Sequence, residues 1–298
     1  MMAKPLSDPP LSIGVPVFNG ERYLAKALLS LVDQTWPDFE LIVCDNASTD
    51  KTEEICRAFE SVDSRIRYVR NAENIGVSGN FMKALHLARG PLFKWASHDD
   101  VCAPTFVARC IEGLQSDPEI VLCHTESRRI DAEGRMLGFY EGEVEAMDDA
   151  PWRRFRRMIR TPHLCIPIFG VLRTEVLRRT PGIGPYVGSD RNLLAELALR
   201  GKILLLPEAL FDRRRHRKTS VGQFPDERAR LRYFDPQNAD RRSFPTWRRM
   251  AEYLNSIQRV PLSPRERLLC MAQLGAWVSG RHHTGIRNAR LMMREVVT

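Results

Sequence analysis

The sequence predicts an α/β fold, in which a mostly parallel sheet is flanked by helices and followed by a basic, helical C-terminal extension. Three observations indicate this class. Strand-like apolar runs alternate with helical stripes in the first half, polar residues collect where those runs end, and arginine accumulates after residue 212. The 298 residues are 43% hydrophobic and 28% charged, which is typical of a globular protein.

Four strands and four helices are predicted to alternate between residues 11 and 114. Leu24, Leu28 and Leu31 recur at helical spacing, and Asp50 with Glu53 resembles a capping box. Arg65 and Arg67, before and within the third strand, indicate that this strand lies near the sheet edge. This alternation predicts a parallel sheet whose ligands bind beyond the carboxyl ends of the strands. The predicted strands are 11–18, 39–44, 66–69 and 91–96, and the helices are 21–35, a segment from Asp50, 78–88 and a segment from Pro104.

The second half is less regular. Ser189 is expected to cap a helix that carries Leu193, Leu194 and Leu197. A helix over 152–160 holds five arginines, and 130–150 is acidic and irregular. Further strands are predicted at 120–124, 166–172 and 203–206, and further helices at 245–258 and 264–278.

The net charge of +8 is unevenly distributed along the chain. Residues 213–298 hold 19 basic and 7 acidic side chains, whereas residues 1–212 hold 26 basic and 30 acidic ones. This imbalance favours an anionic partner near the C-terminal end, such as nucleotide phosphate, an anionic membrane surface or nucleic acid. Nucleic acid is the weakest of the three, because aromatic residues are sparse in this segment and it has no helix-turn-helix or zinc signature.

Several other classes of protein are disfavoured. The turn after the first strand lacks G-x-G-x-x-G, and the chain has neither a P-loop nor a G-x-S-x-G elbow. No apolar run approaches the ~20 residues of a membrane helix, and no signal peptide is recognised. The seven cysteines form no C-x-x-C pair and are expected to be reduced core residues. We expect a cytoplasmic protein, with peripheral attachment to the inner face of the membrane as a second option.

Polar clusters follow three of the predicted strands, at Asn19, at Asp45 and at residues 97–100. Carboxylates after a strand are suited to holding Mg²⁺ or Mn²⁺ against a diphosphate, but they are also common in solvated turns. Asp45 is suited to nucleobase recognition or to capping, and Asp190 has helix-dipole stabilisation as its alternative role. Residues 213–216 form either a phosphate clamp or a solvated charge run.

Taken together, these clusters resemble family 2 glycosyltransferases, which are inverting enzymes with the GT-A fold that use nucleotide-diphosphate sugars. The resemblance covers about residues 10–220 and is strongest in the first hundred. Two departures are Ser97, where the family has the first aspartate of D-x-D, and Gly79, where many relatives have arginine. The matching residues are 12–21, Leu24, Ser30, Leu31, Gln34, 39–50, Asn74, Ile75, Gly76, Asn80, Asp99 and Asp100.

The resemblance implies a role for each matching position. Asp190 is the general base, and Asp99 and His216 are ligands of a divalent cation, Mg²⁺ or Mn²⁺. Arg213, Arg215 and His216 contact the diphosphate. The nucleotide pocket comprises Pro16, Val17, Asn19, Glu21, Asp45, Asn80, Ser97, His98 and Asp99.

The implied reaction is transfer of a hexose from a nucleotide donor, with UDP favoured, to a hydroxyl of a saccharide or lipid-linked acceptor. Surface polysaccharide or glycoconjugate synthesis is the expected context. An inactive GT-A-like scaffold or binding protein is the alternative. The predicted domains are a GT-A domain over 1–216, with a nucleotide half at about 10–102 and an acceptor half at about 103–216, and the extension over 217–298.

One helical face of the extension has two candidate partners. Its residues are Trp247, Met250, Tyr253, Leu254 and Ile257. With arginines beside it, this face is suited to an anionic membrane surface, but packing on the catalytic domain is the favoured alternative.

Overall fold

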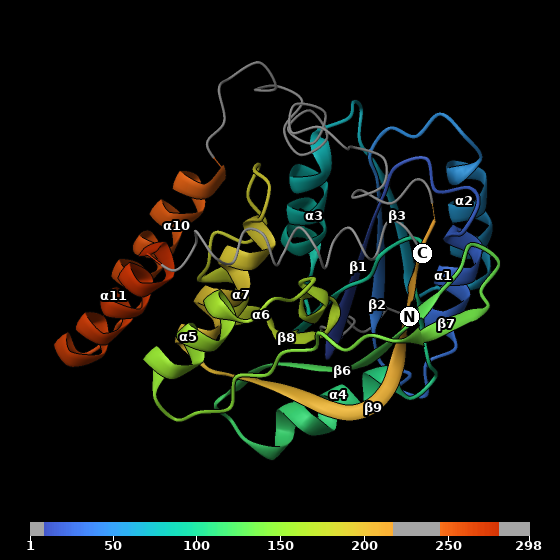
Figure 1. Ribbon diagram of the computed structural model, residues 1–298. Coiled ribbons are helices and arrows are strands. Elements are labelled where there is room, and N and C mark those ends of the chain that lie inside the picture. Colours follow the sequence, from blue (N-terminus) through green and yellow to red (C-terminus); the bar gives the residue numbers. More distant parts are fainter. Residues whose placement is uncertain (1–8, 217–244, 280–298) are drawn as a thin grey trace, which may run out of the picture.

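A computed structural model describes residues 9–216 and 245–279. In these ranges nine strands form a single sheet in the order β3-β2-β1-β4-β8-β6-β9-β5, with β7 paired to β6 (Figure 1). The strands are β1 (Leu11–Val17), β2 (Glu40–Asp45), β3 (Ile66–Arg70), β4 (Leu92–Trp95), β5 (Val101–Cys102), β6 (Ile120–Ile130), β7 (Met136–Phe139), β8 (Val171–Arg173) and β9 (Lys202–Arg214). The helices are α1 (Leu24–Val32), α2 (Thr52–Val62), α3 (Gly76–Leu87), α4 (Phe106–Ser116), α5 (Pro151–Arg160), the short 3-10 helix η1 (Ile166–Phe169), α6 (Thr174–Arg178), α7 (Ser189–Arg200), α10 (Pro245–Arg259) and α11 (Pro264–Ser279).

The first four strands confirm the α/β prediction. β3, β2, β1 and β4 are all parallel, and β3 lies at the edge. In their register Val17 lies beside Asp45, and Asp45 beside Arg70, so the loops after three strands leave the sheet side by side. Beyond β4 the sheet is mixed, because β8 is antiparallel to both β4 and β6, whereas β9 is parallel to β6.

Three local predictions need correction. Residues 166–172 are not one strand: they form η1 and the start of β8, since Pro167 cannot donate to a ladder and Cys165 begins the turn at φ 59°. Ser189 does not cap α7, because Gly188 occupies the cap position at φ 87° and the Ser189 hydroxyl has no hydrogen-bond partner among the described residues. The strand expected at 203–206 extends to residue 214.

The predicted Asp50–Glu53 capping box does not form, because Lys51 and not Asp50 occupies the N-cap position of α2. The Asp50 carboxylate accepts a hydrogen bond from the main-chain nitrogen of Thr52 at 3.0 Å, which stabilises the first turn of α2. Glu53 instead pairs with Arg57 and Arg70. The Glu53 side chain therefore serves the neighbouring strand rather than the cap.

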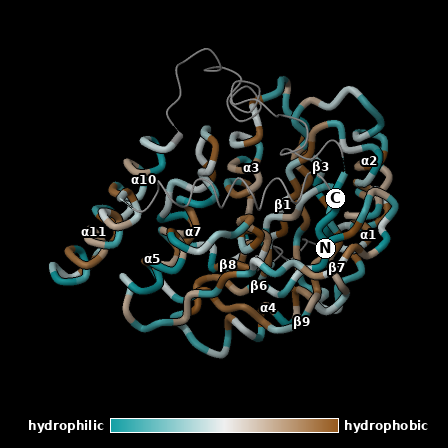
Figure 2. The backbone as a smooth tube through the Cα atoms, viewed as in Figure 1, coloured by the Kyte–Doolittle hydropathy of each residue, from teal (hydrophilic) through white to brown (hydrophobic). Residues whose placement is uncertain are grey.

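Two hydrophobic clusters pack on the two faces of the sheet (Figure 2). One cluster holds α1, α2 and α4 against the parallel strands, and the other holds α3, α5, α7, α10 and α11. The seven cysteines are free and buried, as the sequence predicted. Both faces of the sheet are therefore covered, and the loops at the strand ends are left to form a site.

The helices α10 and α11 begin where they were predicted. Tyr253 and Ile257 of α10 are fully buried, and Met250 and Leu254 pack against the same cluster as α7. Only Trp247 of this face is largely exposed. The face therefore packs on the body of the protein, which is the second of the two predicted options. The predicted division at residue 217 stays a prediction, because 217–244 lie outside the described residues.

Among the described residues, no helix is both long and apolar enough to span a bilayer.

Candidate active site

The loops after β1 and β2 are joined by hydrogen bonds between short polar side chains and main chain. Ser48 accepts from the Asn19 main-chain nitrogen at 2.9 Å, and Asn19 Oδ1 accepts from that of Thr49 at 2.9 Å. The Glu21 nitrogen donates to Asp50 at 3.0 Å. Asn19 and Glu21, both predicted to bind nucleotide, thus belong to one hydrogen-bonded network at the carboxyl edge of the sheet.

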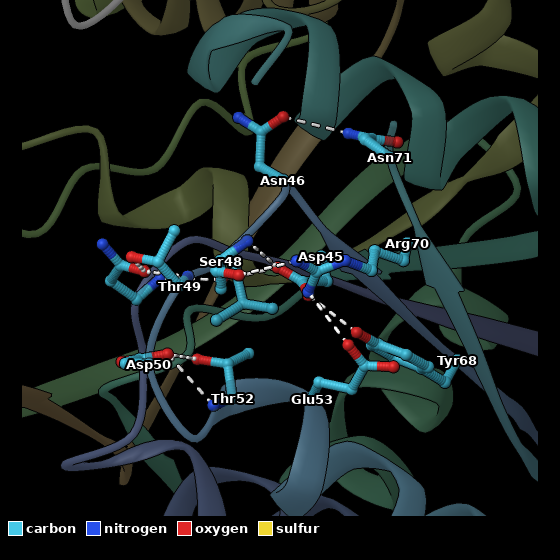
Figure 3. A network of polar contacts seen from close by, with 12 residues as sticks. Asp45, Asn46, Ser48, Thr49, Asp50, Thr52, Glu53, Tyr68, Arg70 and Asn71 are labelled. Atoms are coloured by element: carbon cyan, nitrogen blue, oxygen red, sulfur yellow. Dashed lines mark hydrogen bonds and ion pairs between the residues drawn. The ribbon is translucent and has the colours of Figure 1, made fainter. Parts of the chain in front are cut away.

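Asp45 lies at the centre of this network and is fully buried. One carboxylate oxygen accepts from the main chain and the hydroxyl of Ser48, and the other accepts from Tyr68 and Arg70 at 2.7 Å each (Figure 3). Burial and the bond to Asp45 raise the pKa of Tyr68 well above its usual value. Four bonds fill the accepting capacity of a carboxylate, so a nucleobase can bind to Asp45 only by replacing one of these donors.

Asn80 lies behind the loops rather than on their surface. It is 2% exposed, and its amide donates to the main-chain oxygens of Cys44 at 2.7 Å and Val17 at 3.4 Å. Its oxygen accepts from Asn71 at 3.1 Å. Pro16 and Val17 lie in the ladder with β2. Asn80 thus holds the ends of β1 and β2 together. In this way it would shape a nucleotide pocket without lining the pocket itself.

Left-handed backbone is concentrated in the loops of the site. Asn19 at φ 51°, Ala47 at φ 62° and Cys165 at φ 59° are the non-glycine residues with positive φ in the described chain. Two follow β1 and β2, and the third lies next to Asp190, as described below. Such conformations cost of order 1–3 kcal/mol and cluster at functional sites.

Asp99 and His216 meet although 117 positions separate them in the chain. The antiparallel pairing of β5 with β9 brings the end of β9 to the loop after β4. Asp99 Oδ2 and His216 Nε2 lie 2.9 Å apart, and Ser97 donates to the other oxygen of Asp99. The His216 ring lies 4.7 Å from that of Tyr23, and His98 lies against Gly20. The cluster therefore adjoins the loop after β1.

Asp99 Oδ2 and His216 Nε2 are 2.9 Å apart and hydrogen-bonded to each other. These two side chains could hold a divalent cation if the cation took the place of the shared proton. No group of three or more His, Cys, Asp or Glu suited to a metal occurs in the described residues. The other coordination positions would thus belong to diphosphate oxygens and water, which is how Mg²⁺ is usually held.

The charges around the pair are strongly polarised. Burial alone would raise the pKa of Asp99, but the neighbouring His98 and the bonds from His216 and Ser97 hold it well below its usual range. Burial and the charge of Asp99 raise the pKa of Asp100 above its usual range. The pKa values of the two neighbouring carboxyls are thus shifted in opposite directions.

The arginines of β9 have different environments. Arg214 is buried and donates to the main-chain oxygen of Asp99 at 2.8 Å, so it supports the loop. Arg213 is half-buried, and its positive charge offsets part of the rise in the pKa of Asp100. Arg215 is half-buried, and its main chain bonds to Ile130 at 2.8 Å. The contact of Arg213 and Arg215 with the diphosphate therefore stays a prediction.

Asp190 lies on another element, in the first turn of α7. Its carboxylate accepts from the main-chain nitrogen of Arg191 at 2.8 Å, an interaction that also fits the helix-dipole role. Burial and the nearby Asp190 raise the pKa of the Cys165 thiol. The loop before α7 contacts α3, where Ser78 donates to the main-chain oxygen of Ile183 at 2.6 Å. Through α3 the Asp190 region is connected to the nucleotide half.

Sequence reasoning missed Tyr23, Tyr68 and Arg70, and it placed Arg214 in the phosphate clamp. In the structure Tyr68 and Arg70 hold Asp45, the Tyr23 ring lies against His216, and the buried Arg214 instead braces the Asp99 loop. Arg70 had a signal, because it is the last residue of a strand whose neighbour ends at Asp45. The other three depend on contacts that no local pattern encodes.

Comparison with known proteins decides the family. The protein-family model described as glycosyl transferase family 2 matches residues 12–178 of the sequence. The chain belongs to glycosyl transferase family 2. Among curated relatives of this family 2 chain, a chondroitin synthase of Escherichia coli is 30% identical over 129 residues, which are 43% of this chain and 19% of that protein. An uncharacterized glycosyltransferase of Methanocaldococcus jannaschii is 24% identical over 180 residues, 60% of each chain. The family 2 chain thus spans less than two thirds of these relatives.

Solved structures support the GT-A fold predicted for the family 2 chain. Residues 1–349 of Staphylococcus aureus TarS in complex with UDP align at a TM-score of 0.58 with 17% identity, covering 95% of this chain and 89% of that one. A mannosyltransferase of Pyrobaculum calidifontis in complex with GDP-Man and Mn²⁺ aligns at 0.54 with 16% identity, covering 98% and 80%. At this identity the likeness concerns the fold alone.

Proposed function

We propose that this chain is an inverting glycosyltransferase that transfers a hexose from a nucleoside-diphosphate donor, with UDP favoured, to a hydroxyl of a saccharide or lipid-linked acceptor. The observation that carries the proposal is the meeting of Asp99 and His216 beside the loops after β1 and β2. Relatives named for chondroitin and teichuronic acid synthesis support surface polysaccharide or glycoconjugate synthesis as the context.

Asp45 recognises the base by exchanging one partner. Of its donors, Arg70 lies toward solvent, with a side chain 36% exposed. Arg70 also lies 3.3 Å from Glu53, so it keeps an acidic partner when it leaves Asp45. A base nitrogen that carries hydrogen can then donate to the freed oxygen. Asn19, Glu21 and the main chain of Pro16 and Val17 shape the rest of this pocket.

The diphosphate is held on the side of β9. Asp99 and His216 would hold Mg²⁺ or Mn²⁺, which when bound supplies positive charge to the diphosphate. Arg213 and Arg215 add charge-assisted hydrogen bonds to phosphate oxygens. Ser97 and His98 keep the Asp99 carboxylate oriented and ionised.

Asp190 serves as the general base. The acceptor oxygen forms a bond to the anomeric carbon while the bond from that carbon to the diphosphate oxygen breaks. The hydroxyl proton passes to the Asp190 carboxylate, and the electron pair of the broken bond leaves with the diphosphate. Because attack and departure occur on opposite faces, the anomeric configuration inverts. Such proton transfer contributes ~10²–10⁴ in rate.

Thermal unfolding with UDP, GDP and dTDP, each with and without Mn²⁺ or Mg²⁺, tests the donor site. At ~100 times its dissociation constant a ligand adds ~2.7 kcal/mol of stability. We expect one nucleotide, UDP first, to raise the melting temperature only with metal, and Asp99→Ala to abolish the shift. No shift with any nucleotide would contradict the proposal and favour the inactive scaffold.

A further inference from the structure

The outer face of α5 consists of arginine alone. Arg153, Arg156, Arg157 and Arg160 are exposed, and their spacing of three, one and three places them in one stripe along the helix. The opposite face is buried and includes Phe155, Met158 and Ile159. These four residues are called the arginine stripe below.

The stripe is poorly neutralised. The Arg153 guanidinium lies 3.4 Å from the Asp148 carboxylate. In the described part of the chain, Asp148 is the one acidic residue that forms an ion pair with the stripe. The guanidinium groups of Arg153 and Arg156 lie 5.3 and 5.7 Å from the Trp152 ring. Like charges three and four positions apart destabilise a helix, and in the described chain only the Asp148 carboxylate and the Trp152 ring offset this cost.

The stripe is nevertheless presented on a fixed support. Arg154, on the inner face, donates to the main-chain oxygens of Ala198 at 2.7 Å, Asp148 at 2.7 Å and Asp149 at 2.8 Å. Phe155 packs edge-on against Tyr253 of α10 at 5.8 Å. Figure 1 shows α5 beside α7. The helix cannot rotate its arginines away without breaking these contacts.

The stripe leads toward Asp190. The beginning of α5 lies at the end of α7, where Arg154 meets Ala198, and the residues after α5 return to the beginning of α7, where Arg191 donates to the main-chain oxygen of His163. Cys165, which adjoins Asp190, follows Arg160 by five residues, a span of at most ~18 Å. The stripe itself extends over ~10 Å.

We infer that the arginine stripe binds acidic groups of the acceptor, a few sugar units away from the hydroxyl that reacts near Asp190. This inference rests on the proposed function. A chain that carries carboxylates or phosphates matches a row of guanidinium groups, and its end would reach the α7 terminus. A flat anionic membrane matches less well, because the stripe is one helix wide, carries no exposed apolar side chain, and begins beside the exposed Asp148 and Asp149.

The test compares two triple variants of the full chain. Arg156→Gln, Arg157→Gln and Arg160→Gln together remove three charges from the stripe. Lys26→Gln, Arg57→Gln and Arg179→Gln remove three exposed charges elsewhere. Binding of fluorescent oligogalacturonates, short and long, and of uncharged maltooligosaccharides is measured by anisotropy at low and high salt.

We expect the unmodified chain to bind the long acidic probe more tightly than the short one, with added salt weakening the binding. The stripe variant should bind the long probe about tenfold more weakly or worse, which corresponds to the loss of ~1.4 kcal/mol. The control variant should change by less than about threefold. Equal losses in both variants, or equal binding of the uncharged probe, would overturn the inference.

Two further measurements separate the alternatives. If the stripe variant loses binding to phosphatidylglycerol vesicles but keeps its affinity for the acidic probes, the stripe is a membrane surface and the inference is wrong. The metal-dependent melting shift with nucleotide should be unchanged in the stripe variant. If the unmodified chain shows no melting shift with nucleotide and metal, the proposed function is refuted, whatever the binding of the saccharide probes shows.

Discussion

The part of this family 2 chain up to residue 102, predicted as the nucleotide half, and the part beyond it satisfy their polar groups differently. In the nucleotide half, Asn19, Ser48 and Asp45 bond to one another and to main chain across two loops. Of the eight buried side-chain atoms without a hydrogen-bond partner in the described residues, six lie beyond residue 103. These six are His124 Nδ1, Arg129 Nε, Glu143 Oε2, Ser189 Oγ, Asn192 Oδ1 and Arg249 Nε.

Buried polar atoms are nearly always paired with protein or water. In the loops after β1 and β2, Asn19, Ser48 and Asp45 meet this requirement with one another and with main chain, which holds the left-handed residues in place. Beyond residue 103 more of the buried polar atoms lack a partner within the described residues. Variants of the two halves should therefore respond in opposite ways.

The largest expected effect is on turnover, at Asp190. Asp190→Asn keeps the shape of the side chain but cannot accept the proton, so we expect turnover to fall by ~10²–10⁴. The melting shift with nucleotide and metal should be retained. Turnover close to that of the unmodified chain would remove Asp190 from the role of base and leave it a helix-dipole residue.

Within the nucleotide half, Asp45→Asn should be strongly destabilising. An amide cannot accept from Ser48, Tyr68 and Arg70 together, and it leaves the guanidinium of Arg70 without its buried partner. Breaking such a pair costs ~3–5 kcal/mol, which we reduce to ~2–4 kcal/mol because Arg70 is partly exposed. Denaturant unfolding gives the difference, and a loss below ~1 kcal/mol would show that the network is not needed for stability.

Glu143→Gln, in the acceptor half, should have the opposite sign. Burial raises the pKa of Glu143 to about 7 and lowers that of His124 to about 4, so the folded chain favours both groups neutral. An ionised Glu143 destabilises the folded state, and this penalty grows as the pH rises from the ordinary glutamate pKa to about 7.

The glutamine variant should therefore gain stability over the unmodified chain as the pH rises through that window. The gain should level off above pH ~7 at no more than ~2–3 kcal/mol. Its amide can donate toward His124 Nδ1, which lies 3.7 Å from Glu143 Oε2. Unfolding curves at several pH values measure the effect. A difference between the two chains that does not vary with pH would show that Glu143 titrates normally.

The smallest effect concerns the loop after β2. Ala47 has φ 62°, where glycine is not strained. Ala47→Gly should therefore be neutral or stabilising by up to ~1 kcal/mol. The matched control is Ala25→Gly on the exposed face of α1, which should destabilise by ~0.5–1 kcal/mol. Opposite signs in thermal unfolding would support the strain, and equal losses would argue against it.

The sequence by itself determined the alternating first half and the residues at the strand ends. Short-range spacing is sufficient for these, because a helical stripe or a strand that ends in aspartate is specified within ten residues. The 3-10 helix over Ile166–Phe169 escaped this reasoning, since an apolar run does not distinguish a strand from a turn that Pro167 keeps out of the ladder. The family followed from the resemblance of an ordered set of motifs along the chain, and the family model that matches residues 12–178 confirmed it.

Only the tertiary structure decided which distant residues meet. β9 continues past Pro207 through a bulge, where Leu206 pairs with Thr125 and Ala209 with Glu126, and so carries His216 to Asp99. The same assembly turned the apolar side of α5 inward, together with Arg154, and left the other four arginines of this helix outside. Pairing of strands and docking of helices depend on contacts between segments far apart in the chain, and a local pattern carries no information about them.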